Sequence, residues 1–170
     1  PSRLLFTNCI YHTAVMLRTC AIPKNGYNEN YTCEDYHMWS KIIFDWEIKI
    51  LKEPLTRARD LEGALRYLPK NKEDSIAVRK ELLSKIGMNQ KQIQMELHDE
   101  IQSSKSGIGF LQNIRFIIYL NRLQNKIYKG KYNKLFFIDD LISKRIRLLF
   151  KAEKNLFLIT FYLLMPFKLK

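Results

Sequence analysis

The chain has 170 residues, 46% hydrophobic and 27% charged, which is typical of a globular domain and excludes a disordered chain. It contains only 6 Gly and 5 Pro, which argues against collagen-like, linker-like and many-turned β architectures. The net charge of +12 and the isoelectric point near 9.6 indicate an anionic partner: nucleic acid, an acidic lipid surface or an acidic protein.

The chain begins with a segment, residues 1–31, that we expect to form an irregular or partly extended arm. Pro23–Gly26 is a turn signal, and a polar loop follows it. The first 28 residues contain no Asp or Glu and carry Arg3, Arg18 and Lys24 among Ser and Thr residues. This composition resembles a mitochondrial transit segment and predicts a mitochondrial location. A short basic arm without a targeting role is the alternative.

All three cysteines lie in the first 33 residues, and their odd number and spacing match no small disulfide scaffold. We therefore expect reduced thiols. Cys9-x2-His12 and Cys33-x3-His37 could form the two halves of a Cys2His2 zinc site. However, C-x2-H is not the usual opening half, and Cys20 is left over. We expect these side chains to have buried or surface roles, and we predict no metal and no other cofactor.

Residues 32–104 are predicted to form a helical core region. A first helix should begin at Thr32, with Asp35 as its capping-box partner, and end at Pro54. Its apolar side chains recur at helical spacing on one face: Trp39, Ile42, Ile43, Trp46 and Ile50. A second, short helix is predicted over 56–68, because Pro69 disfavours helical geometry at the residue before it.

Two more helices are expected in this core region. One starts at Asp74 or Ser75 and ends at Ile86, because Gly87 suits the left-handed position that follows a helix. The next is capped by Asn89, continues to Ile101 and ends at a break over 103–107.

The last 66 residues, 105–170, carry nearly all of the excess charge. They hold 14 Lys and Arg against 3 Asp and Glu, a net +11, whereas residues 1–104 have a net charge of +1. Helices are predicted over 110–128 and 133–151. The uncharged tail over 155–167 is too short to span a bilayer as a helix, and we expect it to be buried or packed on a partner.

This basic third contains the predicted anion-binding residues. Steps of seven, four and three residues allow Arg115, Arg122, Lys126 and Lys129 to share one helix face, opposite the apolar face. Aromatic residues such as Tyr119 and Tyr128 alternate with the cations and could stack on unpaired bases, although apolar aromatics are more often core. The full predicted set is Arg115, Arg122, Lys126, Lys129, Lys131, Lys134, Lys144, Arg145, Arg147 and Lys151.

No catalytic motif is present: the sequence lacks GxxxxGK[ST], GxGxxG, HExxH and GxSxG. His98 has Glu96, Asp99 and Glu100 beside it in sequence, but neighbouring helical positions point in different directions. We therefore predict that His98 lies on a solvated helix face, and that the protein is not an enzyme.

Together these patterns predict an all-α protein, a helical bundle or array with an irregular N-terminal arm and a basic C-terminal helical third. The expected function is a structural component of a large ribonucleoprotein, most plausibly a mitochondrial ribosomal protein that contacts rRNA and other subunits. The alternative is an accessory subunit of a mitochondrial inner-membrane respiratory or ATP-synthase complex, whose basic face contacts anionic lipid.

Overall fold

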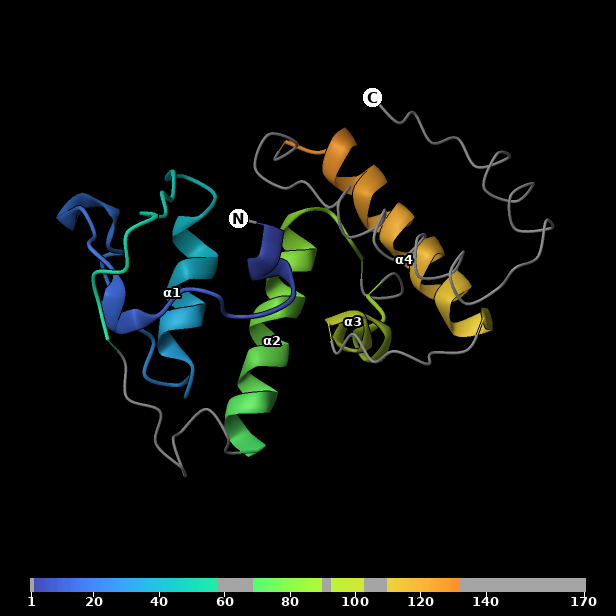
Figure 1. Ribbon diagram of the computed structural model, residues 1–170, viewed down its shortest axis with the longest axis horizontal. Helices are drawn as coiled ribbons and strands as arrows, with labels where there is room; N and C mark the ends of the chain where they lie inside the picture. The colour runs from blue at the N-terminus through green and yellow to red at the C-terminus, as the bar shows by residue number, and fades with distance from the viewer. Residues whose placement is uncertain (1, 58–68, 90–92, 103–109, 132–170) are drawn as a thin grey trace.

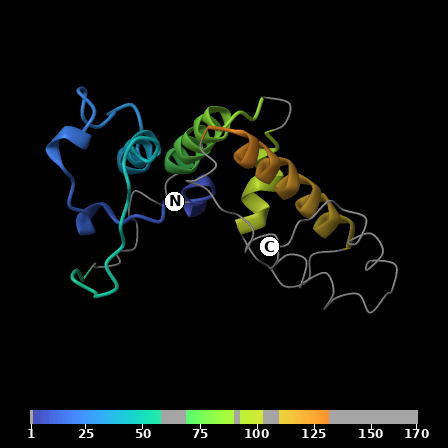
Figure 2. The same ribbon diagram turned by 90° about the horizontal axis from the view of Figure 1, so that it is seen from above.

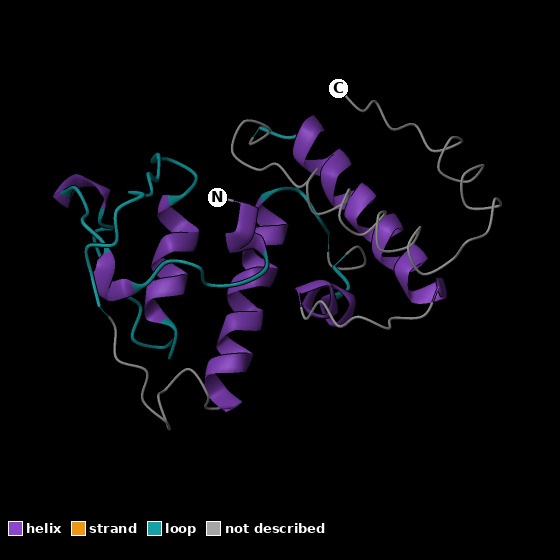
Figure 3. Ribbon diagram, viewed as in Figure 1, coloured by secondary structure: helices purple, strands orange, loops and turns teal. Residues whose placement is uncertain are grey.

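The computed structural model describes residues 2–57, 69–89, 93–102 and 110–131. Three short 3-10 helices come first, η1 (Ser2–Leu5), η2 (His12–Ala14) and η3 (Thr19–Ala21), and four α-helices follow. These are α1 (Glu34–Ile42), α2 (Pro69–Lys85), α3 (Met95–Gln102) and α4 (Phe110–Lys129). The described residues contain no strand, so the prediction of helical structure is confirmed for this part of the chain (Figure 3).

The N-terminal arm is irregular, as predicted, apart from its three short 3-10 helices. The predicted turn at Pro23–Gly26 is formed: the Gly26 N–H donates to the Pro23 carbonyl at 2.8 Å. Gly26 has a φ of 60°, in the left-handed region that favours glycine. The arm therefore runs as loops and single turns until α1 begins.

Helix α1 ends at Ile42, so the predicted continuation to Pro54 is wrong. The chain turns instead, and the N–H groups of Asp45 and Trp46 both donate to the Ile42 carbonyl. Trp46 is 37% exposed and Ile50 is 85% exposed. Helical periodicity alone does not sustain a helix when its apolar side chains have nothing to pack against, and Asp, Trp and Ile are weak helix formers.

The start of α1 also differs from the predicted capping box. Cys33 occupies the N-cap position without a side-chain capping bond. Thr32 instead donates from its backbone N–H and its hydroxyl to Asp74 of α2, each at 2.8 Å, and Asn71 donates to the Thr32 carbonyl. A neighbouring helix, rather than a local partner, therefore fixes the residue that leads into α1.

Helix α2 is described from Pro69 onward, so it includes residues that precede the predicted start at Asp74 or Ser75. The predicted end is confirmed: Gly87 has a φ of 95° and donates to the Ser84 carbonyl, and Met88 donates to the Leu83 carbonyl. This is the Schellman arrangement, and the buried Leu83 and Met88 accompany it.

The remaining predicted helices have mixed outcomes. Of the helix predicted from Asn89, residues 90–92 lie outside the described residues, α3 forms the part from Met95 onward, and the Ile93 N–H donates to the Asn89 carbonyl. Helix α4 matches the prediction to within one residue. The predicted helix over 133–151, the tail over 155–167 and the break over 103–107 lie outside the described residues, as does nearly all of the helix predicted over 56–68.

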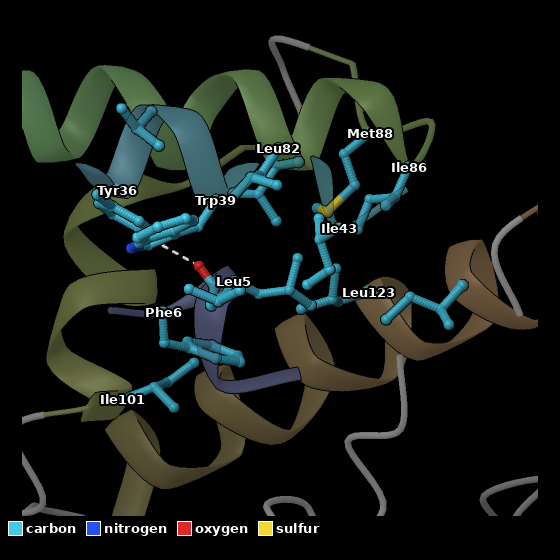
Figure 4. Packing of buried hydrophobic residues seen from close by; sticks show 14 of the residues in the cluster. Leu5, Phe6, Tyr36, Trp39, Ile43, Leu82, Ile86, Met88, Ile101 and Leu123 are labelled. Carbon is cyan, nitrogen blue, oxygen red and sulfur yellow. Dashed lines mark hydrogen bonds between the residues drawn. The ribbon is translucent and has the colours of Figure 1, made fainter. Parts of the chain in front are cut away.

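The core joins two helix pairs, α1 with α2 and α3 with α4, and the start of the chain lies between them (Figures 1 and 2). Leu4, Leu5 and Phe6 are at most 7% exposed and belong to one cluster with buried side chains of all four helices. Figure 4 shows Leu5 and Phe6 between α4 and the pair α1 and α2. The Tyr36 hydroxyl of α1 donates to the Leu4 carbonyl at 2.5 Å. The N-terminal arm is therefore part of the core.

No helix within the described residues is both long enough and apolar enough to cross a bilayer.

The burial of the arm gives a stability prediction. Leu5→Ala should lower the free energy of unfolding by about 3 kcal/mol, the usual cost of emptying a fully buried leucine site. Met16→Ala removes a side chain that is 97% exposed and should change it by less than about 0.5 kcal/mol. Urea unfolding followed by circular dichroism measures both variants. Equal stability of the two would contradict the central position of the arm.

Candidate functional site

Helix α4 carries the described part of the predicted anion-binding set. Its buried side chains occupy one side of the helix and pack into the core: Phe116, Ile117, Tyr119, Leu120, Leu123 and Ile127. Between Phe110 and Lys129 the helix holds four cations and no Asp or Glu. The helix is therefore anchored on one side, and its charge is of a single sign.

The four cations of α4 are Arg115, Arg122, Lys126 and Lys129, and together they form what we call the cationic face. At 100° per residue they fall within an arc of about 60°, which does not overlap the arc of the buried side chains. Arg115, Arg122 and Lys129 are exposed. Lys126 is partly buried, because it lies nearest the buried arc. The predicted shared face is formed, although it borders the apolar face rather than lying opposite to it.

The cationic face extends about 21 Å along α4, from the rise of 1.5 Å per residue. Within the described part of the chain, none of its four cations forms an ion pair with a carboxylate. Lys131, just beyond the helix, is also exposed. The other predicted residues lie outside the described residues: Lys134, Lys144, Arg145, Arg147 and Lys151.

The aromatic residues of α4 do not share the cationic face. Phe116 and Tyr119 are 0% and 2% exposed, so both side chains lie in the core. The interpretation of Tyr119 as a base-stacking residue is therefore wrong. Tyr128 is 49% exposed but lies well outside the arc of the cations. Among the described residues, this face therefore presents cationic side chains without an aromatic one.

His98 is fully buried, so the prediction of a solvated helix face is wrong. Its ring stacks on Phe6, with 4.4 Å between ring centroids. Its Nε2–H donates to the Leu5 carbonyl at 2.6 Å, and the Tyr119 hydroxyl donates to Nδ1 at 2.9 Å. The spacing could have predicted that His98 lies on the apolar side of its helix, because His98 precedes the buried Ile101 by three residues and so shares its face. The neighbouring acids suggested a solvated face instead.

The environment of His98 favours its neutral form. Burial lowers the pKa of His98 to about 4, and the nearby charge of Arg79 acts in the same direction. Arg79 is itself nearly buried and lies 3.0 Å from a carboxylate oxygen of Asp99. Both ring nitrogens of His98 are occupied by protein groups, so this imidazole holds the fold together and is not presented to a substrate.

A polar cluster around Glu81 was not found by sequence reasoning. Tyr31 of the arm donates to one carboxylate oxygen at 2.7 Å, and Lys41 of α1 donates to the other. Partial burial acts to raise the pKa of Glu81, but the hydrogen bonds from Lys41 and Tyr31 outweigh it and lower that pKa. The hydrogen bond to Glu81 raises the pKa of Tyr31 to about 12, so the phenol stays protonated. These charges hold α1, α2 and the arm together.

The cysteines and the other two histidines are dispersed. His12 shares a hydrogen bond of 2.8 Å with the Tyr27 hydroxyl, and His37 stacks on Tyr31. The thiols of Cys9, Cys20 and Cys33 are free. Among the described residues, no three His, Cys, Asp or Glu side chains are grouped so that they could hold a metal ion.

The chain matches no protein-family model, and neither the curated proteins nor the solved structures include one significantly similar to it. The functional argument therefore depends on the chemistry of its own residues.

The buried imidazole gives a pH prediction. Its folded-state pKa lies below the ordinary value of 6.5, so the unfolded chain binds the proton first as pH falls. Stability should therefore decrease by about 3 kcal/mol from pH 6.5 to pH 4, beyond the effect of the carboxylates. His37, whose pKa is also lowered, mainly by burial, adds in the same direction.

Two variants isolate the contribution of His98. His98→Gln keeps a donor for the Leu5 carbonyl but does not titrate, so its loss of stability over this pH range should be smaller than that of the unmodified chain. Met16→Gln, which introduces the same side chain at a 97% exposed position and removes no titrating group, should behave like the unmodified chain. Urea unfolding at several pH values gives the slopes. A slope unchanged in His98→Gln would contradict the assignment of a neutral buried imidazole.

Proposed function

We propose that this protein is a non-catalytic structural component of a large ribonucleoprotein, most plausibly a mitochondrial ribosomal protein. The observation that carries the proposal is the cationic face of α4: four cations in a row about 21 Å long, on a helix without a carboxylate. Lys and Arg side chains in such a row neutralise phosphates and release condensed counterions, which drives binding without reading sequence.

The way α4 is held supports this proposal. The adjoining side of the helix is buried in the core through Phe116, Leu120 and Leu123, each 0% exposed. The cations therefore belong to a helix whose backbone is already fixed by packing, so little backbone entropy is lost when a partner binds. A rigid charged surface suits a protein that occupies one position in an assembly.

The polar clusters in the described residues support a non-catalytic role. His98 has both ring nitrogens occupied, and Glu81 accepts hydrogen bonds from Tyr31 and Lys41. A catalytic acid or base needs access to a substrate proton, which the buried His98 does not offer, and Glu81 is held in its ionised form by the hydrogen bonds from Lys41 and Tyr31.

The proposed mitochondrial location rests on the acid-free composition of the first 28 residues. Because Leu4, Leu5 and Phe6 are core residues, we propose that this arm stays in the folded protein.

RNA binding tests the proposal. The purified chain should bind fluorescently labelled structured RNA, and its affinity should fall steeply with salt concentration. The triple variant Arg115→Ala, Arg122→Ala, Lys126→Ala should bind at least about 10-fold more weakly, with a log–log salt slope shallower by about 2 to 3. Fluorescence anisotropy across a salt series measures both quantities.

A matched control removes the same charge elsewhere. Lys24→Ala, Lys72→Ala, Lys80→Ala also lowers the net charge by three, at exposed positions outside α4. Its affinity for RNA should fall by less than about 3-fold, because only the general charge has changed. Equal losses in the two triple variants would contradict a specific role for α4. Binding to cardiolipin-containing vesicles but not to RNA would overturn the ribonucleoprotein proposal in favour of a subunit that contacts membrane lipid.

A further inference from the structure

The form of the RNA can be inferred from what the cationic face contains and what it lacks. Proteins that bind single-stranded nucleic acid without sequence preference combine a basic groove with aromatic side chains on which successive bases stack. Each stacked base contributes about 5- to 150-fold in affinity. A surface with such aromatics favours unpaired strands. A surface without them lacks the affinity that base stacking adds.

The cationic face has no such aromatics. Phe116 and Tyr119 belong to the core, and Tyr128 lies outside the arc of the cations. The exposed aromatics Tyr11 and Tyr27 belong to the N-terminal loops. These loops lie at the opposite end of the molecule from α4 in both views (Figures 1 and 2). Among the described residues, the face therefore offers charge without a stacking platform.

The geometry of the face also matches a stiff partner. The cations are held in one row by a single uninterrupted helix of 20 residues. A duplex presents its phosphates in a fixed arrangement and at high density, about one charge per 1.7 Å of axis in B-form DNA. A single strand would have to be ordered along the row, and this entropic cost would not be offset by base stacking.

We propose that the partner of the cationic face is double-helical RNA, contacted through its phosphate backbone and not through its bases. This inference rests on the proposed RNA-binding function and specifies the form of RNA. It predicts that the protein recognises the shape and charge of the duplex, because side chains do not enter the deep, narrow major groove of an A-form helix.

The test compares two labelled probes with the full chain: a 20-base-pair RNA duplex and a 20-nucleotide oligouridine that forms no structure. At equal salt, the duplex should bind at least about 10-fold more tightly, because it presents phosphates at higher density along the row of cations and loses less conformational freedom on binding than the single strand. Two duplexes of unrelated sequence should bind within about 2-fold of each other, because backbone contacts carry no sequence information. Four phosphate contacts predict a log–log salt slope of about −4 for the duplex.

Two variants show which chemistry is used. Arg115→Lys, Arg122→Lys keeps the charge but removes the planar guanidinium groups, which can stack on bases and can also bind a phosphate bidentately, so duplex affinity should fall by less than about 10-fold and the preference for duplex over oligouridine should remain. The triple alanine variant at Arg115, Arg122 and Lys126 should lose the preference for duplex, while Lys24→Ala, Lys72→Ala, Lys80→Ala should retain it. Circular dichroism confirms that each variant is folded.

The outcomes separate the two proposals. Tight binding to oligouridine, equal to or stronger than binding to the duplex, would overturn the duplex inference and leave the RNA-binding function standing. Binding to neither probe would overturn the duplex inference and the proposed function together.

Discussion

The structure depends on the buried imidazole of His98, which connects three separate parts of the chain. It lies on α3, donates to the Leu5 carbonyl of the N-terminal arm and accepts from Tyr119 on α4. Phe6 stacks on the same ring. A buried polar group is costly unless its hydrogen bonds are made, so this set of contacts admits one arrangement of the three segments.

The arm that His98 holds supplies core volume that none of the four α-helices provides. Leu5 and Phe6 lie between the pair α1 and α2 and the pair α3 and α4 (Figure 4), and Leu4 belongs to the same buried cluster. Burial of three such side chains stabilises a fold by several kcal/mol, on the order of 2 kcal/mol each. Since a domain is typically stable by only about 5–15 kcal/mol, the first residues of the chain are essential to this one.

The same core fixes the candidate binding surface. Tyr119 and Phe116 turn one flank of α4 inward, and the four cations then necessarily occupy another flank. The burial that removes Phe116 and Tyr119 from possible contact with bases also leaves the cationic face without a neighbouring exposed aromatic ring from this flank. Packing and proposed function are therefore linked through the rotation of a single helix about its axis.

Features that arise within one or two helical turns could be predicted from the sequence. They include the helical character, the bounds of α4 and the common face of Arg115 and Lys129, because the 3.6-residue period is a local property. The end of α2 at Gly87 could also be predicted, because the freedom of glycine at positive φ is local. The tertiary structure alone decided the burial of His98, the length of α1 and the anchoring of Thr32. Their partners are distant in sequence: His98 contacts a residue 93 positions away, and Thr32 contacts one 42 positions away. The spacing to Ile101 places His98 on the apolar face of its helix, but no local pattern encodes which distant groups arrive beside its ring, so only the folded chain determines its hydrogen-bond partners.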